Sequence, residues 1–198
     1  MARTLLLDIG GVFYLSRPDD AFWARWAAHA GCDAKTLRDD FWRDPAAVDV
    51  GIGRLPRRRF YEQTAVRYGM TAEAIESMFQ EVFTGEYNAP FAAYVRGLRS
   101  RDVAVSSLTN NWSTEVELKA RPELAGMFDA VISSCEVGFL KPDAEIYQYA
   151  LDRLGLPASE IVFVDDARVC IDGAIAAGMH GVHFRDTQQA IDEIEGLI

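Results

Sequence analysis

Short apolar runs recur along the chain, and amphipathic patterns of helical period accompany most of them. The runs are aliphatic or β-branched and predict strands at Thr4–Ile9, Val103–Leu108, Ala130–Ser133, Ile161–Val164 and Gly181–Phe184. The helical patterns lie at Phe91–Arg99, Trp112–Lys119, Ala144–Leu154, Cys170–Ala177 and Gln188–Glu195. Strands that alternate with helices are joined by right-handed crossovers into a parallel sheet. We therefore predict an α/β protein with a parallel, Rossmann-like sheet.

The first two predicted strands are separated by a stretch much longer than an ordinary crossover, and this stretch carries no strong strand signal. Its amphipathic patterns predict helices at Asp20–Ala30, Ala34–Trp42, Pro56–Tyr68 and Ala72–Phe83. A connection of this length is expected to carry structure of its own. We expect residues 15–88 to form a helical cap inserted after the first strand, over a core built from residues 1–14 and 89–198.

Polar side chains stand at the ends of three predicted strands and in one loop. They are Asp8, Thr109-Asn110, Lys141 and Asp165-Asp166. In an open α/β sheet, ligands bind outside the carboxyl ends of the strands, so these side chains are expected to converge on one crevice. Carboxylates, a hydroxyl and a lysine in one place suit a divalent metal ion and a phosphoryl group.

The order of these residues resembles the haloacid dehalogenase-like (HAD) hydrolase superfamily, and the resemblance spans nearly the whole chain. Within that superfamily, the segments at 108–112 (Leu-Thr-Asn-Asn-Trp) and 134–143 look like the phosphatase domain of soluble epoxide hydrolases. The resemblance implies a HAD-type α/β core with a helical cap. One departure is clear, because Gly10 stands where the family's second aspartate usually lies. Some sugar-phosphate phosphatase relatives also carry glycine there.

The resemblance also implies roles for the strand-end acids. Asp8 is expected to be the nucleophile, and a carboxylate can accept a phosphoryl group to form an aspartyl-phosphate. Mg²⁺ is the implied cofactor, held by Asp8, the backbone carbonyl of Gly10, Asp165 and Asp166. Asp166 is the expected direct ligand, and Asp165 is either a ligand or a supporting group. Like charges as close as Asp165 and Asp166 repel each other unless a cation lies near them.

Phosphate binding falls to three further residues. Thr109 offers a hydroxyl, and Asn110 offers a backbone N–H where the next helix is expected to begin, since helix N-termini attract phosphate. Lys141 would neutralise phosphate oxygens and keep Asp8 ionised. Thr109 and Lys141 therefore join Asp8 as expected catalytic residues.

Each residue also has a purely structural interpretation. Asp8 precedes two glycines in a common turn composition, and a lone lysine such as Lys141 usually lies on the solvated surface. Thr109-Asn110 and Asp165-Asp166 would serve as N-caps of the helices that follow them. The four sites taken together favour the functional interpretation.

Gly10 cannot protonate the leaving oxygen as an aspartic acid would. General-acid help of this kind contributes about 10²–10⁴ to the rate. Either the substrates have good leaving groups, or water or a cap residue substitutes, or catalysis is slow.

The leading hypothesis is a Mg²⁺-dependent phosphomonoesterase that acts on a small phosphorylated metabolite. One alternative is a 2-haloacid dehalogenase-type hydrolase, in which Gly10 is harmless but Asp165-Asp166 is left without a cation. Another is a catalytically impaired module that binds a phosphate ligand. The sequence specifies neither the natural substrate, the cap residues around it nor the oligomeric state.

Composition excludes several other partners. A net charge of −10 argues against a general binder of nucleic acid or of anionic membranes. No apolar run approaches the length that spans a bilayer, and the N-terminus lacks a signal-peptide pattern. The three cysteines are odd in number and far apart, which indicates free thiols in a reducing compartment. We therefore expect a cytoplasmic protein.

Overall fold

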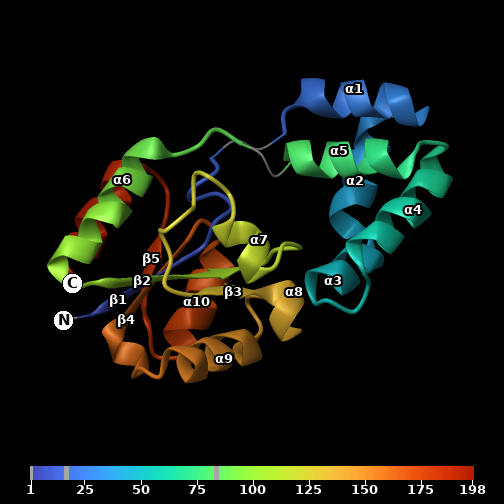
Figure 1. The fold of residues 1–198 in the computed structure, drawn as a ribbon. Coiled ribbons are helices and arrows are strands. Elements are labelled where there is room, and N and C mark those ends of the chain that lie inside the picture. Colours follow the sequence, from blue (N-terminus) through green and yellow to red (C-terminus); the bar gives the residue numbers. More distant parts are fainter. Residues whose placement is uncertain (1, 16–17, 83–84) are drawn as a thin grey trace.

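The computed structural model describes residues 2–15, 18–82 and 85–198, and its centre is a five-stranded parallel sheet (Figure 1). The strands are β1 (Thr4–Leu7), β2 (Ala104–Thr109), β3 (Val131–Ser133), β4 (Ile161–Asp165) and β5 (His180–His183). Their order across the sheet is β3-β2-β1-β4-β5, and every neighbouring pair is parallel. The predicted α/β fold class is confirmed.

Helices cover both faces of this sheet. They are α6 (Ala89–Gly97), α7 (Glu115–Lys119), α8 (Ser134–Val137), α9 (Ala144–Leu154), α10 (Arg168–Ala176) and α11 (Thr187–Glu195), with 3-10 turns at Leu98–Arg101 and Ala158–Glu160. Successive strand residues point to opposite faces, so Leu5 and Leu7 pack on the side of α6 and α11, whereas Leu6 packs on the side of α9 and α10. Two buried faces explain why these strands are continuously apolar.

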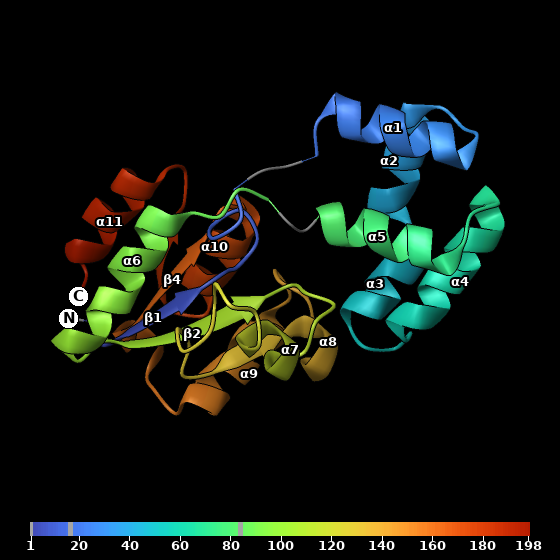
Figure 2. The same cartoon turned by 45° about the horizontal axis from the view of Figure 1, so that its top comes forward.

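Five helices lie between β1 and α6 in the sequence and stand beside the carboxyl edge of the sheet (Figure 2). They are α1 (Asp20–Ala30), α2 (Ala34–Arg43), α3 (Pro45–Gly51), α4 (Arg57–Tyr68) and α5 (Ala72–Val82). They share an apolar core of their own, with Leu37, Phe60 and Ile75 among its buried residues. We refer to these helices as the cap. The predicted helix end at Phe83 lies outside the described residues. The boundaries between core and cap, after residue 14 and after residue 88, stay a prediction.

The predicted helix at 112–119 was wrong at its start. Helix α7 begins at Glu115, because the Thr114 hydroxyl accepts a hydrogen bond from the Glu117 N–H while the Glu117 carboxylate accepts one from the Thr114 N–H. This capping box fixes the first helical turn at that point. Residues 110–113 are therefore a non-helical connection after β2, which gives their side chains other partners.

Candidate active site

The predicted site residues come together at the carboxyl edge of the three central strands. Asp8 directly follows β1, Thr109 is the last residue of β2 and Asp165 is the last residue of β4. Lys141 reaches the same point from the loop before α9. Its ammonium lies 3.1 Å from Asp8 Oδ1 and 2.5 Å from Asp165 Oδ2. A buried lysine thus bridges the ends of two neighbouring strands.

Lys141 is held by both its side chain and its backbone. The Asn110 side chain donates to the Lys141 carbonyl at 2.9 Å and accepts from the Lys141 N–H at 2.8 Å. The Lys141 side chain is only 1% exposed. Burial alone would lower the pKa of Lys141, but the carboxylates of Asp8 and Asp165 outweigh it and raise that pKa above its ordinary value. The lysine therefore remains a cation inside the protein.

Asp8 lies in an environment that resists its ionisation. Burial raises the pKa of Asp8 from 3.8 to about 6, against the opposing effect of Lys141 and with a further rise from the charge on Asp165. Hydrogen bonds from the Thr109 hydroxyl and the Ile9 N–H lower the pKa in part. The Ile9 N–H donates to Asp8 Oδ1 at 2.7 Å. A bound cation would offset the same cost of burial.

Three acids offer a candidate metal site. Asp8, Asp165 and Asp166 each place a carboxylate oxygen within 4.8 Å of the others. Hard carboxylate oxygens are the donors that Mg²⁺ prefers, so the residues present fit this ion. Asp165 already has two partners, because its Oδ2 faces Lys141 and its Oδ1 accepts from the Ala167 N–H at 2.7 Å. Asp165 therefore also holds Lys141 and the start of the segment that leads into α10.

The two glycines that follow Asp8, Gly10 and Gly11, differ in which side chains they could be replaced by. Gly11 has φ of 72°, and a Cβ at this position would lie 2.2 Å from Asp166 Cγ, so only glycine fits. Gly10 has no positive φ, and a Cβ there would meet nothing within 4 Å. The space beside Gly10 therefore does not explain why the family's second aspartate is missing.

Two structural interpretations can now be judged. Thr109 and Asn110 do not cap α7, since its N-cap is Thr114. Asn110 therefore does not stand at a helix start as expected, and its contact with phosphate stays a prediction. The residue before α10 is Ala167, so neither Asp165 nor Asp166 is that helix's N-cap.

Sequence analysis missed two contacts around the site. One is the paired hydrogen bonding of the Asn110 side chain to the Lys141 backbone. The other is His183, whose Nε2 lies 3.0 Å from the Asp166 carbonyl oxygen. No sequence spacing signals either contact, because each joins residues from separate segments of the chain.

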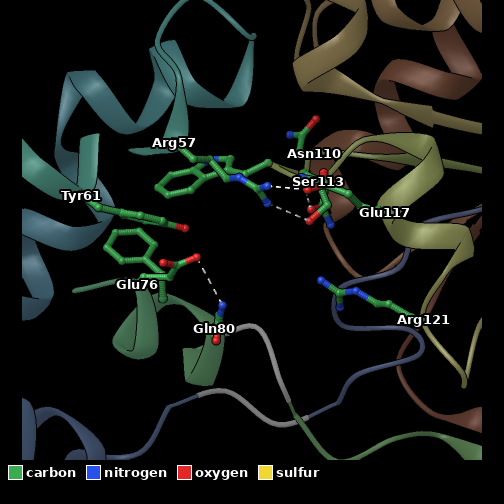
Figure 3. A pocket seen from close by; sticks show the side chains of 11 residues that line it. Arg57, Tyr61, Glu76, Gln80, Asn110, Ser113, Glu117 and Arg121 are labelled. Atoms are coloured by element: carbon green, nitrogen blue, oxygen red, sulfur yellow. Dashed lines mark hydrogen bonds and ion pairs between the residues drawn. The ribbon is translucent and has the colours of Figure 1, made fainter. Parts of the chain in front are cut away.

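A pocket of about 510 Å³ lies between cap and core, and Asn110 is among the residues that line it (Figure 3). Its cap side is formed by Arg57, Tyr61, Glu76, Phe79 and Gln80. Its core side is formed by Asn110, Asn111, Trp112, Ser113, Glu117 and Arg121. Because Asn110 also holds Lys141, the pocket adjoins the cluster of predicted catalytic residues.

Aromatic packing and one ion pair join the cap to the core beside this pocket. The Trp112 ring stacks on Phe79, with centroids 4.8 Å apart, and meets Phe60 edge-on at 5.1 Å. The Arg57 guanidinium lies 2.5 Å from Glu117 and 3.3 Å from the Ser113 hydroxyl. The segment after Thr109 therefore contacts both Lys141, through Asn110, and the cap, through Trp112.

Comparison with known proteins identifies the family. A model of the haloacid dehalogenase-like hydrolases matches residues 2–178. Bifunctional epoxide hydrolase 2 of Rattus norvegicus is 30% identical over 128 residues, which cover 62% of this chain and 23% of that protein. The chain thus spans less than a quarter of that relative. A sesquiterpene phosphatase of Aspergillus oryzae is 28% identical over 149 residues, which cover 74% of this chain and 76% of that protein.

Solved structures share the fold. A HAD family enzyme of Bacteroides thetaiotaomicron, in complex with magnesium and inorganic phosphate, aligns with a TM-score of 0.78 at 18% identity, over 93% of this chain and 95% of that one. No helix among the described residues has the length and apolar character needed to cross a membrane. The chain belongs to the haloacid dehalogenase-like hydrolase family, and its relatives there include phosphatases.

Proposed function

We propose that the protein is a Mg²⁺-dependent phosphomonoesterase that hydrolyses a small phosphorylated metabolite through an aspartyl-phosphate on Asp8. The observation that carries this proposal is the buried lysine that bridges Asp8 and Asp165 beside a third acid, Asp166. This cluster holds an ionised carboxylate and positive charge where a phosphoryl group would react. Phosphoryl transfer depends mainly on such positioning and charge.

The reaction would run in two steps. An Asp8 oxygen attacks phosphorus and the bond from phosphorus to the ester oxygen breaks, so the alcohol leaves with that electron pair and takes a proton from water. A water molecule then attacks phosphorus in the aspartyl-phosphate, which releases inorganic phosphate and restores Asp8. Lys141 and the Thr109 hydroxyl oppose the negative charge on the phosphoryl oxygens.

Asp8, Asp166 and the Gly10 carbonyl are the groups we assign to Mg²⁺. When bound, the ion supplies positive charge beside the phosphoryl oxygens. Asp165 holds the Lys141 ammonium in place, as its 2.5 Å contact indicates. Relatives support the assignment, because one is named a phosphatase and one structural neighbour contains magnesium with phosphate.

The dehalogenase alternative fits this cluster less well. Dehalogenation needs no metal, but here three carboxylates lie together against one lysine. Such an excess of negative charge is costly in a buried site. Gly10 suits dehalogenation, which needs no acid for the leaving group, but the three clustered carboxylates favour phosphate ester hydrolysis.

The test is turnover of para-nitrophenyl phosphate and of a 2-haloacid, each with Mg²⁺ and with a chelator. We expect phosphate release that needs Mg²⁺ and is lost in Asp8→Asn. Asp172→Asn is a matched acid-to-amide control, because Asp172 is exposed on α10 and pairs only with Arg168 in the described structure. Undiminished phosphate release by Asp8→Asn, or turnover of the haloacid alone, would contradict the proposal.

A further inference from the structure

Four side chains that line the pocket between cap and core are of types that are charged at neutral pH: two arginines and two glutamates. Two of them neutralise each other, since Arg57 from α4 lies 2.5 Å from Glu117 on α7. The other two, Arg121 and Glu76, make no ion pair with any residue that the structure describes. A pocket of about 510 Å³ therefore presents one cation and one anion without charged protein partners.

Arg121 stands on the core side, close to the loop that carries the nucleophile. Its guanidinium carbon lies 5.8 Å from the centre of the Tyr14 ring. The Tyr14 carbonyl accepts a hydrogen bond from the Gly11 N–H at 3.0 Å, so Tyr14 belongs to the turn that follows Asp8. The guanidinium also donates a hydrogen bond to the Tyr14 hydroxyl, and this contact fixes its position. A guanidinium has five N–H donors, so others remain for an anion.

Glu76 stands on the cap side. It accepts a long hydrogen bond of 3.5 Å from the Gln80 amide, one turn further along α5, and has no charged partner among the described residues. Figure 3 shows Glu76 and Arg121 extending into the pocket from different sides, one from the cap and one from the core. Their charges are separated across the pocket instead of being joined in one ion pair.

We infer that the leaving group of the natural substrate is small and zwitterionic, with a carboxylate that binds Arg121 and an ammonium that binds Glu76. This inference rests on the proposed phosphatase function. Asn110 marks the phosphate end of the pocket, and the two charged residues face the part that the rest of the substrate would occupy. A phosphorylated hydroxy-amino acid has this chemistry.

An apolar substrate tail fits these residues poorly. Covering Glu76 and Arg121 with hydrocarbon would remove water from both charges and return no hydrogen bond. A ligand with a single extra charge would satisfy one residue and bury the other unpaired. A zwitterion satisfies both, and each charge-assisted hydrogen bond contributes more than a neutral one.

Four phosphate esters test the inference: O-phosphoserine, 3-phosphoglycerate, phosphoethanolamine and glycerol 3-phosphate. They carry both charged groups, the carboxylate alone, the ammonium alone and neither. Wild-type kcat/KM should be highest for O-phosphoserine. Each ester is compared between wild type and variant, so that differences in intrinsic reactivity cancel.

Arg121→Gln should lower kcat/KM for the two carboxylate-bearing esters about tenfold more than for the other two. Glu76→Gln should lower kcat/KM for the two ammonium-bearing esters about tenfold more than for the other two. Arg121→Lys keeps the charge and should recover part of the loss. Glu73→Gln on the same helix and Arg168→Gln on α10 are controls, because neither residue lines the pocket.

Two results would overturn the inference and leave the proposed function intact, provided that the protein still hydrolyses para-nitrophenyl phosphate. One is a wild-type enzyme that hydrolyses glycerol 3-phosphate as well as O-phosphoserine. The other is an equal loss on all four esters in both variants, which would mean that the residues support the fold of the pocket. Thermal unfolding of each variant separates that outcome from misfolding. No turnover of any phosphate ester would overturn the proposed function itself.

Discussion

The indole of Trp112 stacks on the phenyl ring of Phe79, with 25° between the ring planes. Trp112 comes three residues after Thr109, and Phe79 belongs to the buried core of the cap. One short connection therefore runs from the predicted phosphate site into the cap. Because Asn110 in the same connection holds Lys141, the position of the cap and that of the buried lysine are linked.

Truncating this indole should loosen the cap. Trp112→Ala is expected to lower the free energy of unfolding by about 2 kcal/mol, less than a fully buried tryptophan would cost, because the ring is partly exposed. Its KM for phosphate esters should rise. Trp112→Phe keeps a stacking partner for Phe79, so its free energy of unfolding should lie between those of the wild type and Trp112→Ala. Urea unfolding measures the effect, and an unchanged midpoint in Trp112→Ala would mean that the stack does not secure the cap.

Removing the bridging lysine should be more damaging. Lys141→Met leaves Asp8 and Asp165 buried without their cation, and breaking a buried ion pair typically costs about 3–5 kcal/mol. Activity should be lost as well. The double variant Lys141→Met/Asp165→Asn should regain part of the stability, since it removes one of the unpaired charges. Lys35→Met serves as the surface control, because the Lys35 side chain is 77% exposed. An equal loss of stability in that variant would contradict this reasoning.

Magnesium affinity should depend on pH through Asp8. The pKa of Asp8 in the metal-free protein is about 6, so the carboxyl is mostly protonated below that pH and must lose its proton to bind the ion. Affinity should therefore be constant well above pH 6 and fall as the pH drops below it, by about tenfold per unit. Calorimetry at several pH values measures this. A flat profile between pH 5 and 7 would contradict the role of Asp8 as a ligand.

Gly10 should make the chemical step sensitive to the leaving group. An aryl oxide departs without a proton, whereas an alkoxide needs one, so phosphorylation rates should fall steeply as the leaving-group pKa rises. A Cβ at Gly10 would meet nothing within 4 Å, so Gly10→Asp is expected to fold, and it should flatten that dependence. Gly11→Ala is the contrast, because its Cβ would collide with Asp166 and should weaken Mg²⁺ binding. A wild-type rate that is already insensitive to leaving-group pKa would show that another group supplies the proton.

The sheet and the cluster of polar residues at its carboxyl edge were predictable because they depend on local pattern. Apolar strands ending in Asp8, Thr109 and Asp165 place these residues at one edge in any parallel sheet with this connectivity. Helix α9 matches its predicted bounds, Ala144–Leu154. These features need no knowledge of how distant segments pack.

The pocket could not be predicted in the same way. Its cap residues, such as Tyr61 and Glu76, line it together with core residues such as Trp112, and the contacts that bring them together join segments far apart in the sequence. The start of α7 was misjudged because an apolar pattern beginning at Trp112 outweighed the cap signal of Thr114 and Glu117. Helix α3, at Pro45–Gly51, was too short for its pattern to stand out.

The most direct test of the central claim is a search for the phosphorylated enzyme. The protein is mixed with Mg²⁺ and para-nitrophenyl phosphate, quenched rapidly in acid and analysed by intact-mass and peptide mass spectrometry. We predict a mass increase of one phosphoryl group, confined to the peptide that contains Asp8 and missing from Asp8→Asn. Continued turnover with no phosphoryl adduct, or an adduct on a different residue, would contradict the assignment of Asp8 as the nucleophile.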